Sequence, residues 1–394
     1  MVKKHWKQQT RLVHEGQNRS PYGETAEAMY LTSGYVYDSA EQAEARFREE
    51  DDGFIYSRFG NPTVRAFEER MIALEGTQDA RATATGMAAV TATMMSQLQT
   101  GDHIVAARAL FGSCRYVVET LMPKFGVACT LVDGRDIDAW KAAIRPETKV
   151  LFLETPSNPL LEIVDMQAVA DLAHENGARL VVDNVFATPI LQRPTDFGAD
   201  IVVYSATKHI DGQGRCLGGV ILGDQSFIQD ELANFLRQTG PSLSPFNAWV
   251  MLKALETLAL RVDAHCHNAE KLTEFLVNHA QIERVYYPSH ASHPQHNLAM
   301  KQMSRGGNLI AFDVKGGKAN AFKLANALQI ALISNNLGDA KTLITHPATT
   351  THFKLDEAAK TELGITGGSM RVSIGLEDGD DLVHDFDQAL AQLA

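Results

Sequence analysis

Ile201-Val-Val-Tyr-Ser-Ala-Thr-Lys-His209 is a short apolar run followed at once by polar residues. A run of this length with such boundaries is typical of a buried strand. Two upstream stretches repeat the pattern, Val150-Leu-Phe-Leu-Glu-Thr-Pro-Ser-Asn-Pro159 and Leu180-Val-Val-Asp-Asn184. Between them, residues 166–176 have the apolar spacing of an amphipathic helix, and Gly177 follows as a stop signal. Strand, helix and strand joined by short connections predict a parallel α/β sheet.

The alternation of strands and helices continues upstream and changes character downstream. Before residue 150, the sequence predicts a helix at 64–74 and strands at 103–107 and 127–132. After Gly223 it predicts a long helix over 246–279 that is broken near its middle. The remaining expected elements are strands at 309–314 and 370–374 and helices at 319–327 and 380–393.

These patterns divide the chain into three expected parts. Residues 1–62 are polar and aromatic, have little periodicity, and predict an extended arm. Residues 63–250 predict a large α/β domain around a mainly parallel sheet. Residues 251–394 predict a smaller C-terminal α+β domain.

Composition limits the class of protein. The 394 residues are 45% hydrophobic and 21% charged, which is ordinary for a globular protein. The net charge of -12 argues against nucleic acid, because a duplex-binding surface must be basic to displace counterions. No apolar stretch reaches the ~18 residues of a membrane helix, and the N-terminus lacks the apolar core of a signal peptide. The four cysteines form no CxxC pair and fit a reducing compartment, so we expect a cytoplasmic protein that binds neither nucleic acid nor membrane.

Polar side chains at three strand ends are expected to share one site. Asn158, Asp183 and Lys208 stand 25 residues apart, each shortly after a predicted strand. The carboxyl ends of parallel strands meet at one edge of a sheet, and ligands bind just beyond that edge. Desolvation at this edge would lower the pKa of Lys208 and leave a nucleophilic amine. A lone lysine is more often a solvated surface residue, but the hydroxyls of Ser205 and Thr207 beside it favour a site.

Gly86 and Met87 are expected to open a helix near the same edge, and a helix N-terminus favours an anion. Asp183 could instead cap a helix or bind a metal, but no carboxylates or histidines with ligand spacing accompany it. Together these groups suit one cofactor. The amine would bond an aldehyde, the carboxylate would face a ring nitrogen, and the hydroxyls and the helix N-terminus would bind a phosphate. That cofactor is pyridoxal 5′-phosphate, an electron sink for carbanions.

Three histidines invite a metal interpretation. His290, His293 and His296 recur at every third position, a spacing that could attract zinc. Structural zinc normally takes four ligands, and Pro294 favours a loop that enters a helix. The sequence therefore predicts no metal site.

Five motifs, in order along the chain, resemble the cystathionine synthase/lyase family of pyridoxal-phosphate enzymes. They are Tyr56-Ser-Arg-Phe-Gly-Asn-Pro-Thr63, Glu154-Thr-Pro-Ser-Asn-Pro159, Val182-Asp-Asn-Val-Phe-Ala-Thr-Pro189, Tyr204-Ser-Ala-Thr-Lys208 and Arg371-Val-Ser-Ile-Gly-Leu-Glu377. The resemblance runs from about residue 10 to the C-terminus. It implies the type I, aspartate-aminotransferase-like fold and a homotetramer of two dimers with shared active sites.

The resemblance also implies a role for each matching residue. Lys208 and Asp183 match the catalytic pair, of which the lysine bonds the cofactor and the aspartate faces its ring nitrogen. Arg371 matches the clamp on the substrate α-carboxylate, a task that suits the bidentate fork of arginine. The other implied cofactor contacts are Gly86, Met87, Ser205 and Thr207 at the phosphate, Tyr56 and Arg58 reaching into the neighbouring subunit's phosphate site, Asn158 near the phenolic oxygen, and Phe111 on the ring face.

Two departures from the family pattern narrow the implied activity. Phe111-Gly-Ser113 replaces the usual ring-stacking tyrosine, and methionine γ-lyases carry a cysteine where Ser113 stands. Asn335-Asn336 replaces the Glu-Ser of many synthases and lyases, and the run from there to His352 resembles the sulfhydrylase branch. The resemblance thus implies conversion of O-succinylhomoserine and sulfide to homocysteine and succinate in methionine biosynthesis. Cystathionine γ-synthase or γ-lyase activity, and a non-catalytic cofactor-binding homologue, are the alternatives.

The succinyl group of this substrate carries a second carboxylate. We therefore expect a second cationic side chain, in addition to Arg371, in the substrate-binding site. Arg115 is the best-placed candidate, four residues after Phe111, with Arg46 and Arg48 behind it. The alternative is that these arginines are solvated surface residues without a role in binding, since arginines are mostly exposed. Arg371, Asn336 and Arg115 are therefore the expected substrate-binding residues.

Overall fold

The computed structural model describes residues 6–393 and contains two sheets. The larger sheet has the strand order β1-β7-β6-β5-β4-β2-β3, and β7 runs antiparallel to both of its neighbours while the other pairs are parallel. Its strands are β1 Asp79–Thr83, β2 His103–Ala107, β3 Ala128–Val132, β4 Thr148–Glu154, β5 Arg179–Asp183, β6 Ile201–Ser205 and β7 Gly219–Gly223. This mainly parallel sheet confirms the expected fold class of the larger part.

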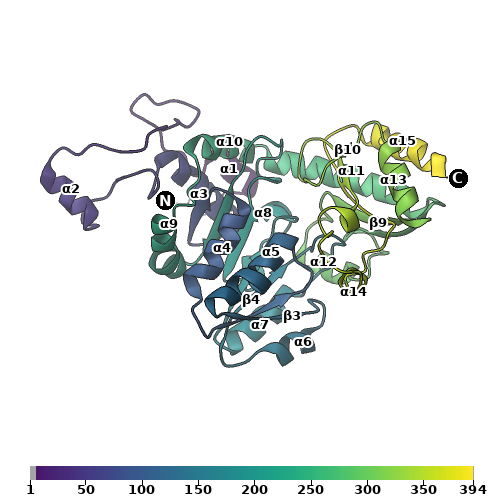
Figure 1. Ribbon diagram of the computed structural model, residues 1–394. Coiled ribbons are helices and arrows are strands. Elements are labelled where there is room, and N and C mark those ends of the chain that lie inside the picture. The colour runs from purple at the N-terminus through teal and green to yellow at the C-terminus, as the bar shows by residue number, and fades with distance from the viewer. Residues whose placement is uncertain (1–5, 394) are drawn as a thin grey trace.

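The smaller sheet has five strands in the order β10-β11-β12-β9-β8. They are β8 Ile282–Tyr286, β9 Leu309–Val314, β10 Leu332–Ile333, β11 Leu343–Thr345 and β12 Ser369–Ser373. In Figure 1 this sheet and its helices lie at the C-terminal end of the molecule, beside the larger α/β layer.

The helices cover both faces of the large sheet and one face of the small one (Figure 1). Helices α3, α7 and α10 pack on one face of the large sheet, and α4 and α5 pack on the other. Helices α11, α13 and α15 pack on the small sheet. The helices are α1 Gln8–His14, α2 Ala40–Phe47, α3 Pro62–Glu75, α4 Gly86–Gln97, α5 Gly112–Tyr116, α6 Ile137–Ala143, α7 Met166–Glu175, α8 Thr188–Leu191, α9 Ala233–Thr239, α10 Pro245–Leu255, α11 Leu258–Val277, α12 His296–Gln302, α13 Gly317–Ala327, α14 Glu357–Glu362 and α15 Gly379–Leu390.

The central strands are buried on both faces, which explains why they read as continuous apolar runs. In β4, Leu151 and Leu153 enter the core under α3 and α7, while Val150 and Phe152 enter the core under α4 and α5. The central strands β4, β5 and β6 end on the polar residues Glu154, Asp183 and Ser205, at the carboxyl edge of the sheet.

Helix α3 shows how local sequence sets an element's limits. Asn61 caps its first turn by accepting from the N–H groups of Thr63 and Val64, and Pro62 occupies the first position. Gly76 ends it with φ of 84°, a left-handed conformation that favours glycine. The helix expected at 64–74 is thereby confirmed.

The N-terminal part differs from a uniformly extended arm. Helix α1 packs on α3, because Leu12 is buried in the shared core and Arg11 Nη1 donates to the Ala73 carbonyl oxygen at 3.0 Å. The chain then leaves the body as a long excursion that carries α2 (Figure 1). Among the described residues, no helix is both long and apolar enough to cross a membrane.

The expected domain boundary at residue 250 falls inside α10. Helix α10 packs on α3 of the large layer, and α11 follows after a break and packs on α15 and β8. The expected long helix over 246–279 is thus confirmed as two helices. The division into 63–250 and 251–394 stays a proposal.

Candidate active site

The strand ends of the large sheet converge on a cavity of about 230 Å³. Asn158 and Lys208, which follow β4 and β6, and Asp183, which ends β5, all line it, so the structure brings together side chains that stand far apart in the sequence. The other sequence-predicted residues that line it are Gly86, Met87, Phe111, Ser205, Thr207 and Arg371.

Lys208 directs its amine toward Asn336, in the segment between β10 and β11 of the smaller sheet. Its Nζ donates to the Asn336 side-chain oxygen at 2.5 Å. Burial, and secondarily the charge of Arg371, lowers the pKa of Lys208 to about 8. An amine with this pKa is neutral and nucleophilic in a useful fraction of molecules near neutral pH.

Asp183 ends β5 with a buried carboxylate. One oxygen accepts from the Val185 backbone N–H at 3.1 Å, and the other lies 3.9 Å from the Cys114 sulfur. Burial raises the pKa of Asp183 to about 7. A cationic ring nitrogen placed opposite this carboxylate would favour its ionised form.

The start of α4 forms a cradle that could hold an anion. Thr85 caps the helix by accepting from the Ala88 N–H at 3.0 Å, which leaves the N–H groups of Gly86 and Met87 without an intrahelical partner. A Cβ atom on residue 86 would lie 2.5 Å from the Ser205 Cβ, so only glycine allows this close approach. Free N–H groups at a helix N-terminus favour a phosphate.

Arg371 is buried beside the cavity and keeps one donor unused. It reaches from β12 to donate to the Asn158 side-chain oxygen at 3.0 Å and to the Asn335 carbonyl oxygen at 3.0 Å. Its Nε has no hydrogen-bond partner, and burial lowers the pKa of Arg371 to about 10. A substrate carboxylate could occupy the open side of this guanidinium.

Glu154 is a cavity residue that the sequence reasoning missed. It ends β4, lines the cavity, and accepts from the backbone N–H groups of Phe111 and Asn158. Burial, and secondarily the charge of Asp183, raises the pKa of Glu154. The sequence feature that could have identified Glu154 as a site residue is its place as the last residue of an apolar strand.

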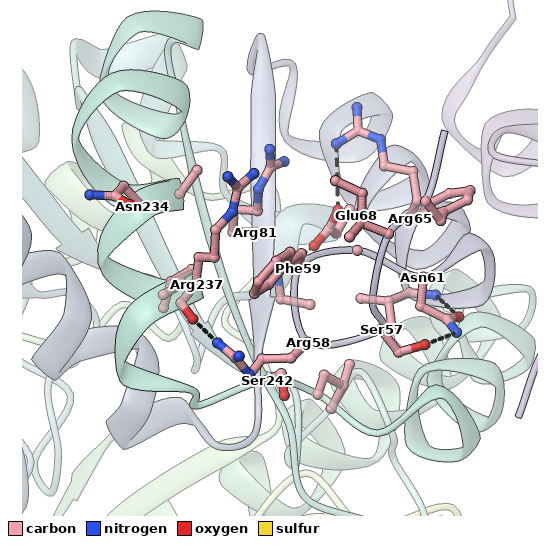
Figure 2. Close-up of a pocket in the computed structure, with 18 of the residues that line it drawn as sticks. Ser57, Arg58, Phe59, Asn61, Arg65, Glu68, Arg81, Asn234, Arg237 and Ser242 are labelled. Carbon is pink, nitrogen blue, oxygen red and sulfur yellow. Dashed lines mark hydrogen bonds and ion pairs between the residues drawn. The ribbon is translucent and has the colours of Figure 1, made fainter. Parts of the chain in front are cut away.

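Four predicted residues are not part of this cavity's lining: Tyr56, Arg58, Arg115 and Asn336. Arg58 lines a second, larger cavity of about 870 Å³ on the arm side of the molecule, where it donates to the Arg237 carbonyl oxygen. Figure 2 shows Arg58 and Arg237 around the ring of Phe59. Tyr56 is exposed and stacks near the Arg58 guanidinium. Neither residue meets Lys208 within one chain.

Arg115 also stands apart from the cavity lining. It follows Phe111 by one helical turn, but its Nε lies 2.5 Å from a carboxylate oxygen of Glu119. To make its predicted contact with a substrate carboxylate, Arg115 would therefore have to release Glu119. Arg46 and Arg48 are likewise paired, with Asp51 and Glu44.

The histidines flagged as a zinc alternative have other partners. The segment enters α12 at His296, as expected from Pro294. His293 Nε2 lies 3.1 Å from the Leu161 carbonyl oxygen. Across residues 6–393, no group of three or more His, Cys, Asp or Glu side chains could hold a metal ion.

Comparison with protein families explains this set of side chains. The family described as Cys/Met metabolism PLP-dependent enzyme matches residues 9–391. The chain belongs to this family. An O-succinylhomoserine sulfhydrylase from Mycobacterium tuberculosis is 51% identical over 96% of this chain and 94% of that protein. An L-methionine gamma-lyase from Porphyromonas gingivalis is 40% identical over 98% of this chain and 97% of that protein.

A solved structure of the family supports the fold and the cofactor. The structure named as an O-acetylhomoserine (thiol)-lyase from Campylobacter jejuni matches with a TM-score of 0.94 and 32% identity, covering 98% of this chain and 100% of that one. It contains an N′-pyridoxyl-lysine 5′-monophosphate. Pyridoxal 5′-phosphate, expected from the strand-end residues, is confirmed as the cofactor of this family of enzymes.

The cavity of this family member fits pyridoxal 5′-phosphate on its own chemistry. The glycine-only approach at residue 86 and the two free N–H groups suit a phosphate. Lys208 would bond the aldehyde carbon, Asp183 would face the ring nitrogen, and Phe111 would cover the ring. Ser205 and Thr207 would add phosphate contacts, and Asn158 would face the phenolic oxygen.

Proposed function

We propose that the protein converts O-succinylhomoserine and sulfide to homocysteine and succinate. The observation that carries the proposal is the meeting of Lys208, Asp183 and Arg371 at one cavity in a chain 51% identical to an O-succinylhomoserine sulfhydrylase. Cystathionine γ-synthase or γ-lyase activity is the second candidate. Turnover of O-succinylhomoserine with sulfide, measured against turnover with cysteine, separates the two.

The proposed chemistry assigns distinct tasks to the residues of the cavity. When bound, pyridoxal 5′-phosphate supplies an electron sink for negative charge at the substrate Cα. Arg371 binds the α-carboxylate, and the Lys208 amine takes the Cα proton and then one Cβ proton. The Cγ–O bond breaks and succinate leaves with the electron pair. The sulfur of sulfide then forms the Cγ–S bond, and Lys208 returns one proton to Cβ and one to Cα.

Asn336 supports this proton transfer by holding Lys208. Its side-chain oxygen accepts from the amine at 2.5 Å, while its carbonyl oxygen lies 3.4 Å from an Arg371 nitrogen. One residue of the smaller domain thus contacts both the proton carrier and the proposed carboxylate clamp. This contact supports Asn336 as a residue of the substrate side of the site.

Substrate choice is tested by comparing the succinyl and acetyl esters. Wild-type enzyme is expected to prefer O-succinylhomoserine in kcat/KM, and Arg115→Ala is expected to lower that preference about tenfold, the effect of one charged hydrogen bond. The reason is that the guanidinium of Arg115 can leave Glu119 for the second carboxylate of the substrate. The measurement is steady-state kinetics with both esters and sulfide.

Arg193→Ala is the matched control, because Arg193 is, like Arg115, partly buried and paired with a nearby carboxylate, that of Asp196 at 2.6 Å. It should leave the ester preference unchanged. A wild-type preference for the acetyl ester would overturn the substrate assignment. An unchanged succinyl preference in Arg115→Ala would remove only the role of Arg115.

We further propose a homotetramer of two dimers, with Tyr56 and Arg58 completing the neighbouring subunit's site. The support is the excursion that carries α2, which exposes Tyr22 at 94% and Val36 at 93% of their surface. Leu31 and Phe47 of the same excursion are also exposed, at 67% and 66%, and exposed apolar side chains that gather in one segment mark an interaction surface. Four free cysteines support a reducing, cytoplasmic compartment.

Subunit sharing predicts complementation between two inactive variants. Arg58→Ala loses the arm's cation, Lys208→Ala loses the amine, and a hybrid dimer holds one intact site. After random exchange about a quarter of wild-type activity should return, because half of the dimers are hybrids with one working site of two. Exchange is followed with differently tagged subunits. If exchange is complete and activity stays absent, each site is built within one chain.

A further inference from the structure

Glu154 is a buried carboxylate that the proposed reaction does not use. Its side chain lines the cavity and the residue is only 3% exposed. It is the register neighbour of Asp183 on the adjacent parallel strand, so the two carboxylates lie side by side at the sheet edge. Burying a second negative charge beside Asp183 is unfavourable unless its partners compensate, so Glu154 calls for a physical explanation.

Both oxygens of Glu154 are occupied by backbone donors from different segments. One oxygen accepts from the Phe111 N–H at 2.7 Å, at the turn that opens α5. The other accepts from the Asn158 N–H at 2.9 Å, in the loop that follows β4. One side chain therefore fixes the backbone under the ring of Phe111 and under the amide of Asn158.

Glu154 is also linked to Arg371, the proposed carboxylate clamp, through Asn158. Asn158 links the two, since its N–H donates to Glu154 and its side-chain oxygen accepts from Arg371 at 3.0 Å. The groups that face Glu154 are Asp183, Arg371 and the Cys114 thiol.

We propose that Glu154 is a positioning residue, which sets Phe111 and Asn158 relative to the cofactor ring through its two hydrogen bonds to their backbone N–H groups. The inference rests on the cofactor site of the proposed function. It assigns Glu154 no contact with the reacting atoms. Its effect should therefore appear in the orientation of the bound cofactor and in kcat, more than in the amount of cofactor bound.

The test is Glu154→Gln in the holoenzyme, with visible circular dichroism of the bound cofactor as the readout. Glutamine keeps the size but offers one acceptor oxygen, and its NH₂ group would face an N–H donor. We expect full cofactor occupancy, loss of visible ellipticity per bound cofactor, and a fall in kcat of about tenfold or more. KM should stay within about threefold of wild type.

Asp385→Asn is the matched control. Asp385 is a buried carboxylate in α15 that accepts from the N–H groups of Gln329, Ile330 and Ala331 at 2.7, 2.9 and 3.1 Å, far from the cavity lining. It should lower stability without changing ellipticity or kcat. Equal losses in Asp385→Asn would overturn the proposal, because they would mark a general effect of losing a buried carboxylate.

Glu154→Asp decides the matter if the glutamine variant does not fold. It keeps the charge but is shorter by one methylene, so it cannot reach both N–H groups, and we expect the same loss of ellipticity and kcat. Wild-type ellipticity and kcat in either folded variant would overturn the proposal. The dichroism reports bound cofactor alone, so a wild-type enzyme that fails to use O-succinylhomoserine would sink the proposed reaction without touching this inference.

Discussion

Lys208→Ala should lose turnover by at least about 10²–10⁴-fold, the contribution of a positioned acid–base group, and should no longer hold the cofactor covalently. Burial lowers the pKa of this amine to about 8, while hydrogen bonds to Glu256 and Glu27 raise the pKa of Lys253. No other lysine lines the cavity within residues 6–393. The loss should therefore not be rescued from within the site.

Two measurements check this prediction. Wild-type protein should be yellow, and borohydride treatment should fix the cofactor to the peptide that contains Lys208, as read by mass spectrometry. Lys208→Ala should release the cofactor on dialysis after the same treatment. In cofactor-free wild type, the rate of cofactor attachment should rise with pH through about 8, since the neutral amine is the nucleophile.

Lys253→Ala is the control for the lysine variant. Lys253 is half-buried but is paired with Glu27 at 3.1 Å, and its pKa is raised. It does not line the cavity, and its loss should leave turnover within a few-fold of wild type. Near-normal turnover in Lys208→Ala would contradict the assignment of the amine.

The sequence allowed the convergence of Lys208, Asp183 and Asn158 to be predicted because parallel topology fixes where strands end. Each strand is buried on both faces, so its apolar run and its polar end are both visible in the sequence. Strand β1, Asp79–Thr83, was missed because it carries charged residues at positions where the core strands are apolar. It joins the sheet through antiparallel pairing with β7, which no local pattern encodes.

Side-chain partners were harder to predict than strand ends. Glu154 reads equally well as the first solvated residue after a strand, and only the approach of Phe111 and Asn158 identifies it as buried. The pairing of Arg115 with Glu119 follows helical spacing of four residues and was available from the sequence. The proposed partner of Arg58 was not available from the sequence, because the cofactor site that Arg58 is proposed to complete lies on another chain.

Asp183→Asn should bind cofactor but lose carbanion chemistry. A carboxylate opposite the ring nitrogen keeps that nitrogen protonated, and protonation makes the ring an effective electron sink. Asparagine keeps the shape and can still accept from the Val185 N–H, so it removes the charge and little else. Asp183→Ala removes both. We expect both variants to keep cofactor, because the proposed phosphate cradle at Gly86 and Ser205 is separate from Asp183.

The fall in turnover caused by these substitutions decides whether Asp183 keeps the ring nitrogen protonated. The folded carboxyl has a pKa of about 7 in the cofactor-free cavity because burial disfavours its charge. A bound ring cation would reverse that preference, and the ion pair would form where little water competes. Removing it should slow turnover by well over tenfold, and a smaller loss, worth less than ~1.4 kcal/mol of barrier, would contradict the role. The measurement is kcat at equal cofactor occupancy. Asp385→Asn should keep wild-type kcat, which would place the loss in the charge at the ring rather than in buried carboxylates generally.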